Sequence, residues 1–383
     1  MNKDFNYIDK SVVYLDSACQ TLRPEVVLQS MENYYREYNS CGGGRTKYSW
    51  GKTVDDKVDE ARSSVLSLLR LKKKDYFVSF TQSTTYGINL LLSQLKLPID
   101  KVITTEIEHN SVFVPTISFA KKNKIKRVVL KREVDGSLSL ENDFKNSLVV
   151  INAMSNIDGR LLNNIKELVK TVHRSGGFII IDAAQAMGSN YELLQKVQAD
   201  AICTSAHKMY SASLGVMIIR KDLIKYIEPT FLGGGQVADV DLDSYELLEK
   251  TEPNTLFEPG LLPWAEIVAL TESIPWLMKA KKESQVDMLA SDLYAYLKSQ
   301  KSLTLINNES TSVISFYHEN LDSHLIAKAL SNEGVMVRSG YFCCHYYLKN
   351  ILRLPPLVRI SIGLHTNKDD ISKLKEVLER LLN

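Results

Sequence analysis

The 383-residue sequence has few cysteines, little net charge and no long apolar run, and each shortage argues against a class of protein. Its five cysteines are an odd and sparse set, which is typical of a reducing cytoplasm rather than of a disulfide-bonded secreted protein. A formal net charge of +2 leaves no dominant basic surface, so we expect no nucleic-acid partner. No apolar run approaches the roughly 20 residues that cross a membrane, and residues 1–10 lack the apolar core of a signal peptide. We therefore expect a cytoplasmic protein without a membrane segment.

What the sequence does contain is a regular alternation of apolar runs and helical patterns over its first two thirds. Most of the runs are continuously apolar, which is typical of strands that helices cover on both faces. The predicted strands span residues 76–80, 101–105, 126–130, 147–152, 177–182, 199–205 and 215–219. This pattern predicts an α/β fold with an open, mostly parallel sheet.

The pattern changes after about residue 265, where long helices come first and are followed by strands mixed with helices. A strand at 311–317, a helix at 323–333 and a closing helix at 369–382 indicate a second, smaller α+β domain. We therefore expect a large domain over residues 1–264 and a small domain over residues 265–383. The N-terminal residues 1–25 are expected to pack near the small domain.

Several polar residues directly follow the apolar strands, where open α/β sheets bind their ligands. Asp182 ends the strand 177–182. Because a bare buried carboxylate is costly, it needs a partner, either the backbone of the next helix or a protonated heterocycle nitrogen. Gln185 offers an amide to the same ligand, and His109 lies at the end of another strand. For His109 both a structural role and a ligand contact remain open.

Lys208 follows the strand 199–205, at a place where an ammonium loses its hydration. Its side chain either reaches solvent along an apolar surface or forms a covalent bond to a cofactor. Ser83, Thr84 and Thr85 begin a helix and present hydroxyls and backbone N–H groups, as ordinary caps do and as a phosphate site requires. A phosphate site, a carboxylate for a ring nitrogen and a lysine for an aldehyde together describe pyridoxal phosphate. We therefore favour a cofactor site.

Short motifs are spread in a fixed order over nearly the whole chain: "YLDSA" (14–18), "STT" (83–85), "EHNS" (108–111), "SNIDG" (155–159), "DAAQA" (182–186), "SAHKMY" (205–210), "LGGG" (232–235), "FEPG" (257–260), "VRSGYFC" (337–343) and "RISIGLHTNKDDI" (359–371). This order resembles class V aminotransferase-fold enzymes, and most of all the cysteine desulfurases and selenocysteine lyases. The resemblance implies the type I fold of pyridoxal-phosphate-dependent transferases, with a mixed, mostly parallel seven-stranded sheet and a smaller C-terminal domain. It also implies a homodimer.

The resemblance assigns roles to the residues at the matching positions. Lys208 matches the lysine that forms the Schiff base, and Asp182 matches the partner of the pyridine nitrogen. Gln185 would contact the ring hydroxyl, and His109 would stack on the ring and assist in catalysis. The phosphate ligands would be Thr84, Thr85, Ser205 and His207, with Ser83 in the same predicted site. No metal ion is expected.

The resemblance also implies how a substrate is bound. Asn156 matches an asparagine near the substrate and the ring, and Arg359 matches the arginine that binds the substrate carboxylate. The planar guanidinium suits a bidentate carboxylate pair, whereas a surface salt bridge is the alternative for Arg359. Cys343 matches a nucleophilic cysteine that takes sulfur from L-cysteine, leaving alanine and an enzyme persulfide. A buried apolar cysteine is the alternative, and Cys344 could share or replace the role.

Some positions depart from the family pattern. Tyr341 and Phe342 replace two histidines, and Leu261 replaces a threonine that commonly reaches the partner subunit's phosphate. "YSASLG" (210–215) is one residue shorter than the usual segment, and Cys19 stands where a small apolar residue is usual. These differences suggest altered substrate handling or a divergent branch.

We therefore expect a pyridoxal-phosphate-dependent cysteine desulfurase that acts on L-cysteine and passes sulfur to an acceptor. Three alternatives remain open. The protein could be an aminotransferase, epimerase or lyase that acts on a different amino acid. It could be a sulfur-transfer component that works only with an acceptor protein. It could be a non-catalytic scaffold on a decayed enzyme fold.

Overall fold

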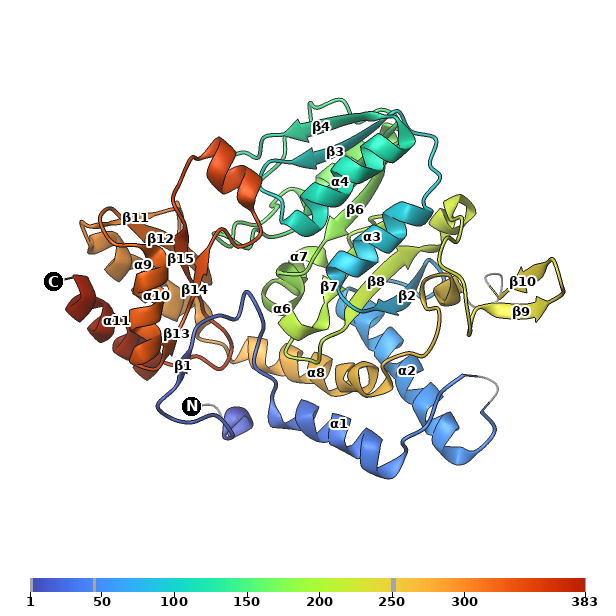
Figure 1. The fold of residues 1–383 in the computed structure, drawn as a ribbon, viewed down its shortest axis with the longest axis horizontal. Coiled ribbons are helices and arrows are strands. Elements are labelled where there is room, and N and C mark those ends of the chain that lie inside the picture. Colours follow the sequence, from blue (N-terminus) through green and yellow to red (C-terminus); the bar gives the residue numbers. More distant parts are fainter. Residues whose placement is uncertain (1–2, 44–45, 249–252, 383) are drawn as a thin grey trace.

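The computed structural model describes residues 3–43, 46–248 and 253–382, and a seven-stranded sheet forms the centre of its larger part (Figure 1). The strands lie in the order β2-β8-β7-β6-β5-β3-β4. Strand β8 runs antiparallel to its neighbours β2 and β7, and the other pairs are parallel. The strands are β2 (Tyr76–Thr81), β3 (Lys101–Thr105), β4 (Lys126–Leu130), β5 (Ser147–Asn152), β6 (Phe178–Asp182), β7 (Ala201–Ser205) and β8 (Gly215–Arg220). The predicted mostly parallel sheet is confirmed.

Helices cover both faces of this sheet, which explains why its strands are continuously apolar. In β5, Val149 and Ile151 belong to one core cluster and Leu148 and Val150 to the other. Helices α2, α5 and α8 contribute to the first cluster and α3 and α4 to the second. The helices of this part are α1 (Glu25–Glu37), α2 (Ser49–Leu68), α3 (Thr84–Gln94), α4 (Asn110–Asn123), α5 (Ile165–Arg174), α6 (Ala186–Ser189), α7 (Tyr191–Leu194) and α8 (Trp264–Lys282).

The smaller part has its own antiparallel sheet in the order β11-β12-β15-β14 and a separate core cluster (Figure 1). A parallel pair, β1 with β13, brings the N-terminal segment to this part, and Val13 and Leu15 lie in its core. The strands are β1 (Val13–Tyr14), β11 (Leu303–Leu305), β12 (Val313–His318), β13 (Val335–Met336), β14 (Arg338–Gly340) and β15 (Leu357–Ser361). The helices are α9 (Val286–Ser299), α10 (Ser323–Asn332) and α11 (Lys368–Leu382).

Helix α8 packs on the larger part, although the predicted boundary at residue 264/265 assigns it to the small domain. Its buried residues Ile267, Leu270 and Ile274 belong to the core cluster of the seven-stranded sheet. Apart from Val13 and Leu15 of the N-terminal segment, the core of the smaller part begins at Val286 in α9. We therefore propose that the large domain ends after α8 rather than before it.

The remaining elements are short. A hairpin formed by β9 (Val237–Val240) and β10 (Tyr245–Leu247) projects from the body of the molecule (Figure 1). Short 3-10 helices span Lys3–Phe5, Ala206–Lys208, Lys221–Tyr226 and Pro253–Phe257, and a π-helical segment spans Tyr346–Ile351. Within the three described ranges, no helix has both the length and the apolar character needed to cross a bilayer.

Candidate active site

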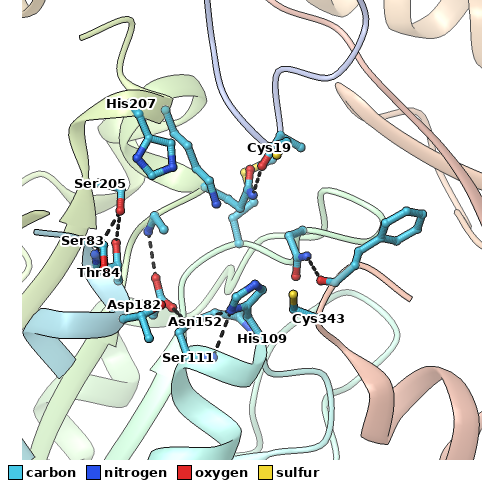
Figure 2. Close-up of a pocket in the computed structure, with 18 of the residues that line it drawn as sticks. Cys19, Ser83, Thr84, His109, Ser111, Asn152, Asp182, Ser205, His207 and Cys343 are labelled. Atoms are coloured by element: carbon cyan, nitrogen blue, oxygen red, sulfur yellow. Dashed lines mark hydrogen bonds between the residues drawn. The ribbon is translucent and has the colours of Figure 1, made fainter. Parts of the chain in front are cut away.

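A cavity of about 240 Å³ lies where the strands of the large sheet end and the smaller part begins. Every residue predicted for the site lines it, and Figure 2 shows many of their side chains around one space. These residues are Ser83, Thr84, Thr85, His109, Asn156, Asp182, Gln185, Ser205, His207, Lys208, Cys343 and Arg359. The fold thus brings together residues that lie up to 276 positions apart, from Ser83 to Arg359 (359 − 83).

Asp182 ends β6 and is buried below the cavity. Its Oδ1 accepts a hydrogen bond from the backbone N–H of Ala184, and its Oδ2 accepts one from the hydroxyl of Ser111, both at 3.0 Å. Burial raises the pKa of the carboxyl group, while these hydrogen bonds and the charge of Lys208 oppose the rise. The two hydrogen bonds thus fix the orientation of the Asp182 carboxyl group. Ser111 was missed as a site residue, although it lies within the quoted motif "EHNS".

His109 caps the N-terminus of α4 with its ring. Its Nδ1 accepts a hydrogen bond of 3.0 Å from the backbone N–H of Ser111, which leaves the ring proton of a neutral imidazole on Nε2. Burial, followed by the charges of Lys208 and Arg359, lowers the pKa of His109 to about 4. The ring is therefore uncharged at neutral pH and suited to stacking on a flat ligand.

The N-terminus of α3 forms the predicted anion site. Ser83 caps the helix, because its hydroxyl accepts a hydrogen bond of 3.1 Å from the backbone N–H of Tyr86. The hydroxyl of Ser205, at the end of β7, lies 3.1 Å from the backbone nitrogen of Thr84 and also contacts the Thr84 hydroxyl. These groups lie together in Figure 2. The partial positive charge of a helix N-terminus favours an anion at this point.

Strand β8 approaches the backbone at the N-terminus of α3 closely and so supports this anion site. A Cβ atom added to Gly215 in β8 would lie 2.5 Å from the carbonyl carbon of Ser83, so glycine allows the strand to approach the cap. His207 lines the same end of the cavity (Figure 2). Burial lowers the pKa of His207 to about 4, with smaller contributions from Lys208 and Arg23. A neutral His207 would therefore bind an anion as a hydrogen-bond donor and not as a cation.

Lys208 ends a 3-10 helix that follows β7, and its side chain lines the cavity. Among the residues that the structure describes, none gives its ammonium a hydrogen bond or an ion pair within bonding distance. Burial lowers the pKa of Lys208, although the charge of Asp182 opposes the shift. A Cβ atom added to Gly188 in α6 would lie 1.8 Å from the Lys208 carbonyl oxygen, so α6 packs directly on this backbone. The Lys208 backbone is thus closely packed, and its amine has no partner among the described residues.

Gln185 and Cys19 lie where the N-terminal segment meets the cavity. The amide nitrogen of Gln185 donates a hydrogen bond of 2.7 Å to the carbonyl oxygen of Ala18. Cys19 is partly exposed and lines the cavity (Figure 2). The amide oxygen of Gln185 therefore remains for a ligand, while its nitrogen holds the N-terminal segment in place.

Arg359 lies in β15 and is only 3% exposed, so it is not a surface salt bridge. Its Nη2 donates to Asp16 Oδ1 at 3.0 Å, and its Nη1 donates to the carbonyl oxygen of Asn156 at 3.1 Å. The Nε atom is buried, and no residue in the described ranges gives it a hydrogen-bond partner. The guanidinium lies 4.7 Å from the centre of the Phe342 ring. Arg359 lines the cavity, and its planar guanidinium is suited to a carboxylate ligand.

Asp16 and Arg338 were not predicted for this site. Asp16 lies between the two arginines, because its Oδ2 is 3.6 Å from Arg338 Nη1 while its Oδ1 binds Arg359. Arg338 lines the cavity from β14. Both residues belong to quoted motifs, "YLDSA" and "VRSGYFC", but their pairing depends on how β15 meets the N-terminal segment.

Cys343 and Cys344 differ sharply in their surroundings. Cys343 is exposed and lines the cavity, whereas Cys344 is 1% exposed and does not. The backbone N–H of Asn110 donates a hydrogen bond of 2.7 Å to the carbonyl oxygen of Cys343. Of the two thiols, only that of Cys343 can therefore reach a ligand in the cavity. Among the departures from the pattern, Leu261 is 75% exposed and is not part of the cavity wall.

Comparison with known proteins identifies the family of the chain. The family described as "Aminotransferase class-V" matches residues 13–374. The chain belongs to this family. A protein from Pyrococcus abyssi named "Probable cysteine desulfurase" is 28% identical over 390 residues, covering 98% of this class V chain and 95% of its own length. A protein of the same name from Methanothermobacter thermautotrophicus is 29% identical over 384 residues, covering 96% and 94%.

Solved structures of this family share the fold. A cysteine desulfurase from Thermococcus onnurineus superposes with a TM-score of 0.88 at 26% identity, covering 97% of this chain and 94% of that one. A cysteine desulfurase from Escherichia coli shares the fold with a TM-score of 0.87 at 22% identity. The class V chain therefore has the type I fold of pyridoxal-phosphate-dependent enzymes, and its family membership makes it an enzyme of this kind.

Proposed function

We propose that this class V enzyme is a cysteine desulfurase that removes sulfur from L-cysteine, releases alanine and holds the sulfur as a persulfide on Cys343. One observation carries the proposal: an exposed thiol, that of Cys343, lines the same cavity as the unpaired amine of Lys208 and the buried carboxyl group of Asp182. The relatives named as cysteine desulfurases support it.

The residues around the cavity fit pyridoxal phosphate. Lys208 would supply the aldehyde with an amine that no described residue binds, and Asp182 would supply a buried carboxylate for the ring nitrogen. The uncharged ring of His109 is suited to stack on the pyridine, and the amide oxygen of Gln185 is free to approach the ring hydroxyl. The phosphate would be held by Ser83, Thr84, Thr85, Ser205 and His207. When bound, the cofactor withdraws electrons from the α-carbon of an amino acid joined to it.

The protein's own residues would then orient the substrate. We expect the α-carboxylate to bind Arg359, whose Nε lacks a partner and whose position is fixed by Asp16 and by the carbonyl oxygen of Asn156. The amide of Asn156 lies beside the same space. Two fixed ends, the amine-binding end at Lys208 and the carboxylate end at Arg359, would hold the substrate side chain toward Cys343.

Proton and sulfur transfer would follow from two side chains. The lowered pKa of Lys208 makes its amine a base that can remove the α-proton of the substrate. The thiolate of Cys343 would attack the substrate sulfur, so that a new S–S bond forms as the substrate C–S bond breaks. Protonation of the remaining three-carbon unit gives alanine.

The test is to incubate the cofactor-loaded enzyme with L-cysteine and to measure two products. We expect alanine to form, and we expect the peptide that contains Cys343 to gain the mass of one sulfur atom in mass spectrometry under non-reducing conditions. Formation of a keto acid without alanine would instead favour an aminotransferase. Alanine formation without added sulfur on the protein would reject a cysteine nucleophile.

We also propose that the enzyme is a cytoplasmic homodimer that passes its sulfur to an acceptor protein. The five free thiols agree with a reducing compartment. Large apolar side chains are exposed near the β9–β10 hairpin, and a second subunit could cover them. They are Phe231, Val240, Leu242 and Tyr245. Light scattering during gel filtration should give twice the chain mass, and an acceptor protein should increase the turnover of cysteine.

A further inference from the structure

The thiol of Cys344 lies in an apolar cluster that joins the two parts of the molecule. The cluster includes Ile107 and Ile157 from the large domain and Leu348 and Leu357 from the smaller part. Burial in these surroundings raises the pKa of the Cys344 thiol. Cys344 therefore stays protonated at neutral pH and remains able to donate a hydrogen bond.

The acceptor of that hydrogen bond is the side chain of Asn156. The Nδ2 atom of Asn156 donates to the carbonyl oxygen of Phe342 at 2.8 Å, and a carbonyl oxygen can only accept. This contact fixes the orientation of the amide, so its Oδ1 faces Cys344, whose Sγ lies 3.0 Å away. One amide thus binds the residues on both sides of Cys343.

The backbone around Cys343 needs such support. Phe342 and Cys343 have φ angles of 47° and 58°, a left-handed conformation that is uncommon for residues other than glycine. Such conformations persist only where surrounding contacts hold them. Besides the Asn156 amide, the loop has a hydrogen bond from Asn110 N–H to the Cys343 carbonyl and one from Cys344 N–H to the Tyr341 carbonyl.

We propose that Cys344 is a positioning residue for the sulfur-accepting thiol. By donating its S–H to Asn156, it holds the loop 341–345 in the conformation that directs Cys343 into the cavity, and it does not itself accept sulfur. The kinetic consequence rests on the proposed desulfurase function, whereas the consequence for loop structure does not.

The experiment compares Cys344→Ala with Cys344→Ser. Both variants remove the sulfur volume, but only serine keeps a donor for Asn156 Oδ1. Hydrogen exchange measured by mass spectrometry on residues 341–348 should be about fivefold faster in the alanine variant, because the buried Oδ1 of Asn156 is left without a donor. The serine variant should exchange close to the native rate. Native exchange in the alanine variant, or equal acceleration in both variants, would overturn the anchoring role.

Kinetics on L-cysteine provide a second measurement with the same pair. We expect kcat to fall about fivefold in Cys344→Ala, with KM changed less than about twofold because Arg359 keeps its contacts. Cys344→Ser should restore kcat, and sulfur should be found on Cys343 alone in the native protein and in the serine variant. Sulfur on Cys344, or an alanine variant with native kcat and KM, would contradict the proposal. If the native enzyme forms no alanine, the proposed function fails, and the exchange comparison still decides whether Cys344 anchors the loop.

Discussion

The cavity has two halves that are held in place in different ways. In the large-domain half, Asp182 and Ser205 end strands of one sheet and Lys208 follows a strand. Elements of the same domain hold them, such as Ser111 in α4, which donates a hydrogen bond to Asp182. In the small-domain half, Arg359 and Cys343 are held by contacts that cross between parts of the chain, such as Arg359 with Asp16 and Phe342 with Asn156. The first half therefore depends on packing within the large domain, and the second depends on how the two domains pack against each other.

This difference suggests that the two halves of the cavity have separate functions. The large-domain half contains the groups suited to bind pyridoxal phosphate, which many amino-acid reactions share. The small-domain half contains the groups that would choose the substrate and receive its sulfur. Changes in the first half should abolish cofactor binding and activity together, whereas changes in the second should spare the cofactor.

The largest effect is expected for Lys208→Ala. The cofactor can no longer be bound covalently, and the base for the α-proton is lost, so alanine formation should fall about 10³-fold or more. Absorbance spectra after gel filtration should lack the yellow band of the bound cofactor. A variant that kept this spectrum and native turnover would remove Lys208 from the site.

Cys343→Ser should separate the halves most clearly. The cofactor spectrum should stay native because the large-domain half is untouched, while persulfide disappears and alanine formation falls about 10²-fold or more, since a hydroxyl is a poor sulfur acceptor. Cys41→Ser is the matched control, because Cys41 is also exposed but does not line the cavity. An equal loss of alanine formation in both variants, or full turnover without Cys343, would contradict the proposed separation between the two halves of the cavity.

Arg359→Lys tests carboxylate binding. A lysine cannot reproduce the planar guanidinium, so KM for L-cysteine should rise about 10-fold to 100-fold, which corresponds to a charged hydrogen bond of about 1.5–3 kcal/mol. The matched control is Arg338→Lys, because Arg338 is more exposed and lies 3.6 Å from Asp16. Steady-state kinetics should show a change of less than about threefold there. A larger increase in KM for Arg338→Lys than for Arg359→Lys would assign carboxylate binding to Arg338.

The smallest effect concerns pH and the buried His365, whose Nε2 lies 2.9 Å from the carbonyl oxygen of Tyr14. Burial lowers the pKa of His365 to about 4 from an unfolded value of 6.5. The unfolded chain therefore binds a proton that the folded chain does not, and stability is lost as pH falls from 6.5 toward 4. Between pH 7 and pH 5 this loss is about 2 kcal/mol.

His365→Gln should be less sensitive to this change of pH than the native protein, by about 2 kcal/mol. The free energy of unfolding in urea at pH 7 and pH 5 measures the difference. If both proteins lose the same stability, His365 is not the responsible group.

The sequence predicts the large-domain half well for a physical reason. Strands β3 and β5 span the predicted runs 101–105 and 147–152, because both faces of the sheet are buried there. The carboxyl ends of parallel strands meet at one edge, so residues that follow such strands could be expected to share a site. The placement of Asp182 and Lys208 followed from this rule.

The domain boundary and the small-domain half of the cavity depend on packing that no local sequence pattern reveals. Helix α8 is buried on several sides, so its apolar pattern does not show which core it joins. The pair Asp16–Arg359 joins residues 343 positions apart, and neither residue signals the other. Likewise, adjacent cysteines with different surroundings could not be distinguished before the loop conformation was known.

The N-terminal segment between Val13 and Thr21 is fastened at both ends. The N–H of Val13 donates to the carbonyl oxygen of Gly334 in the smaller part, and that of Thr21 donates to the carbonyl oxygen of His207, next to Lys208. A hinge movement that separated the two domains would have to stretch or detach this strap. We therefore expect the width of the cavity to be set before any amino acid binds. Amino acids with bulky side chains would then be excluded by the fixed size of the opening, and not because the domains fail to close around them.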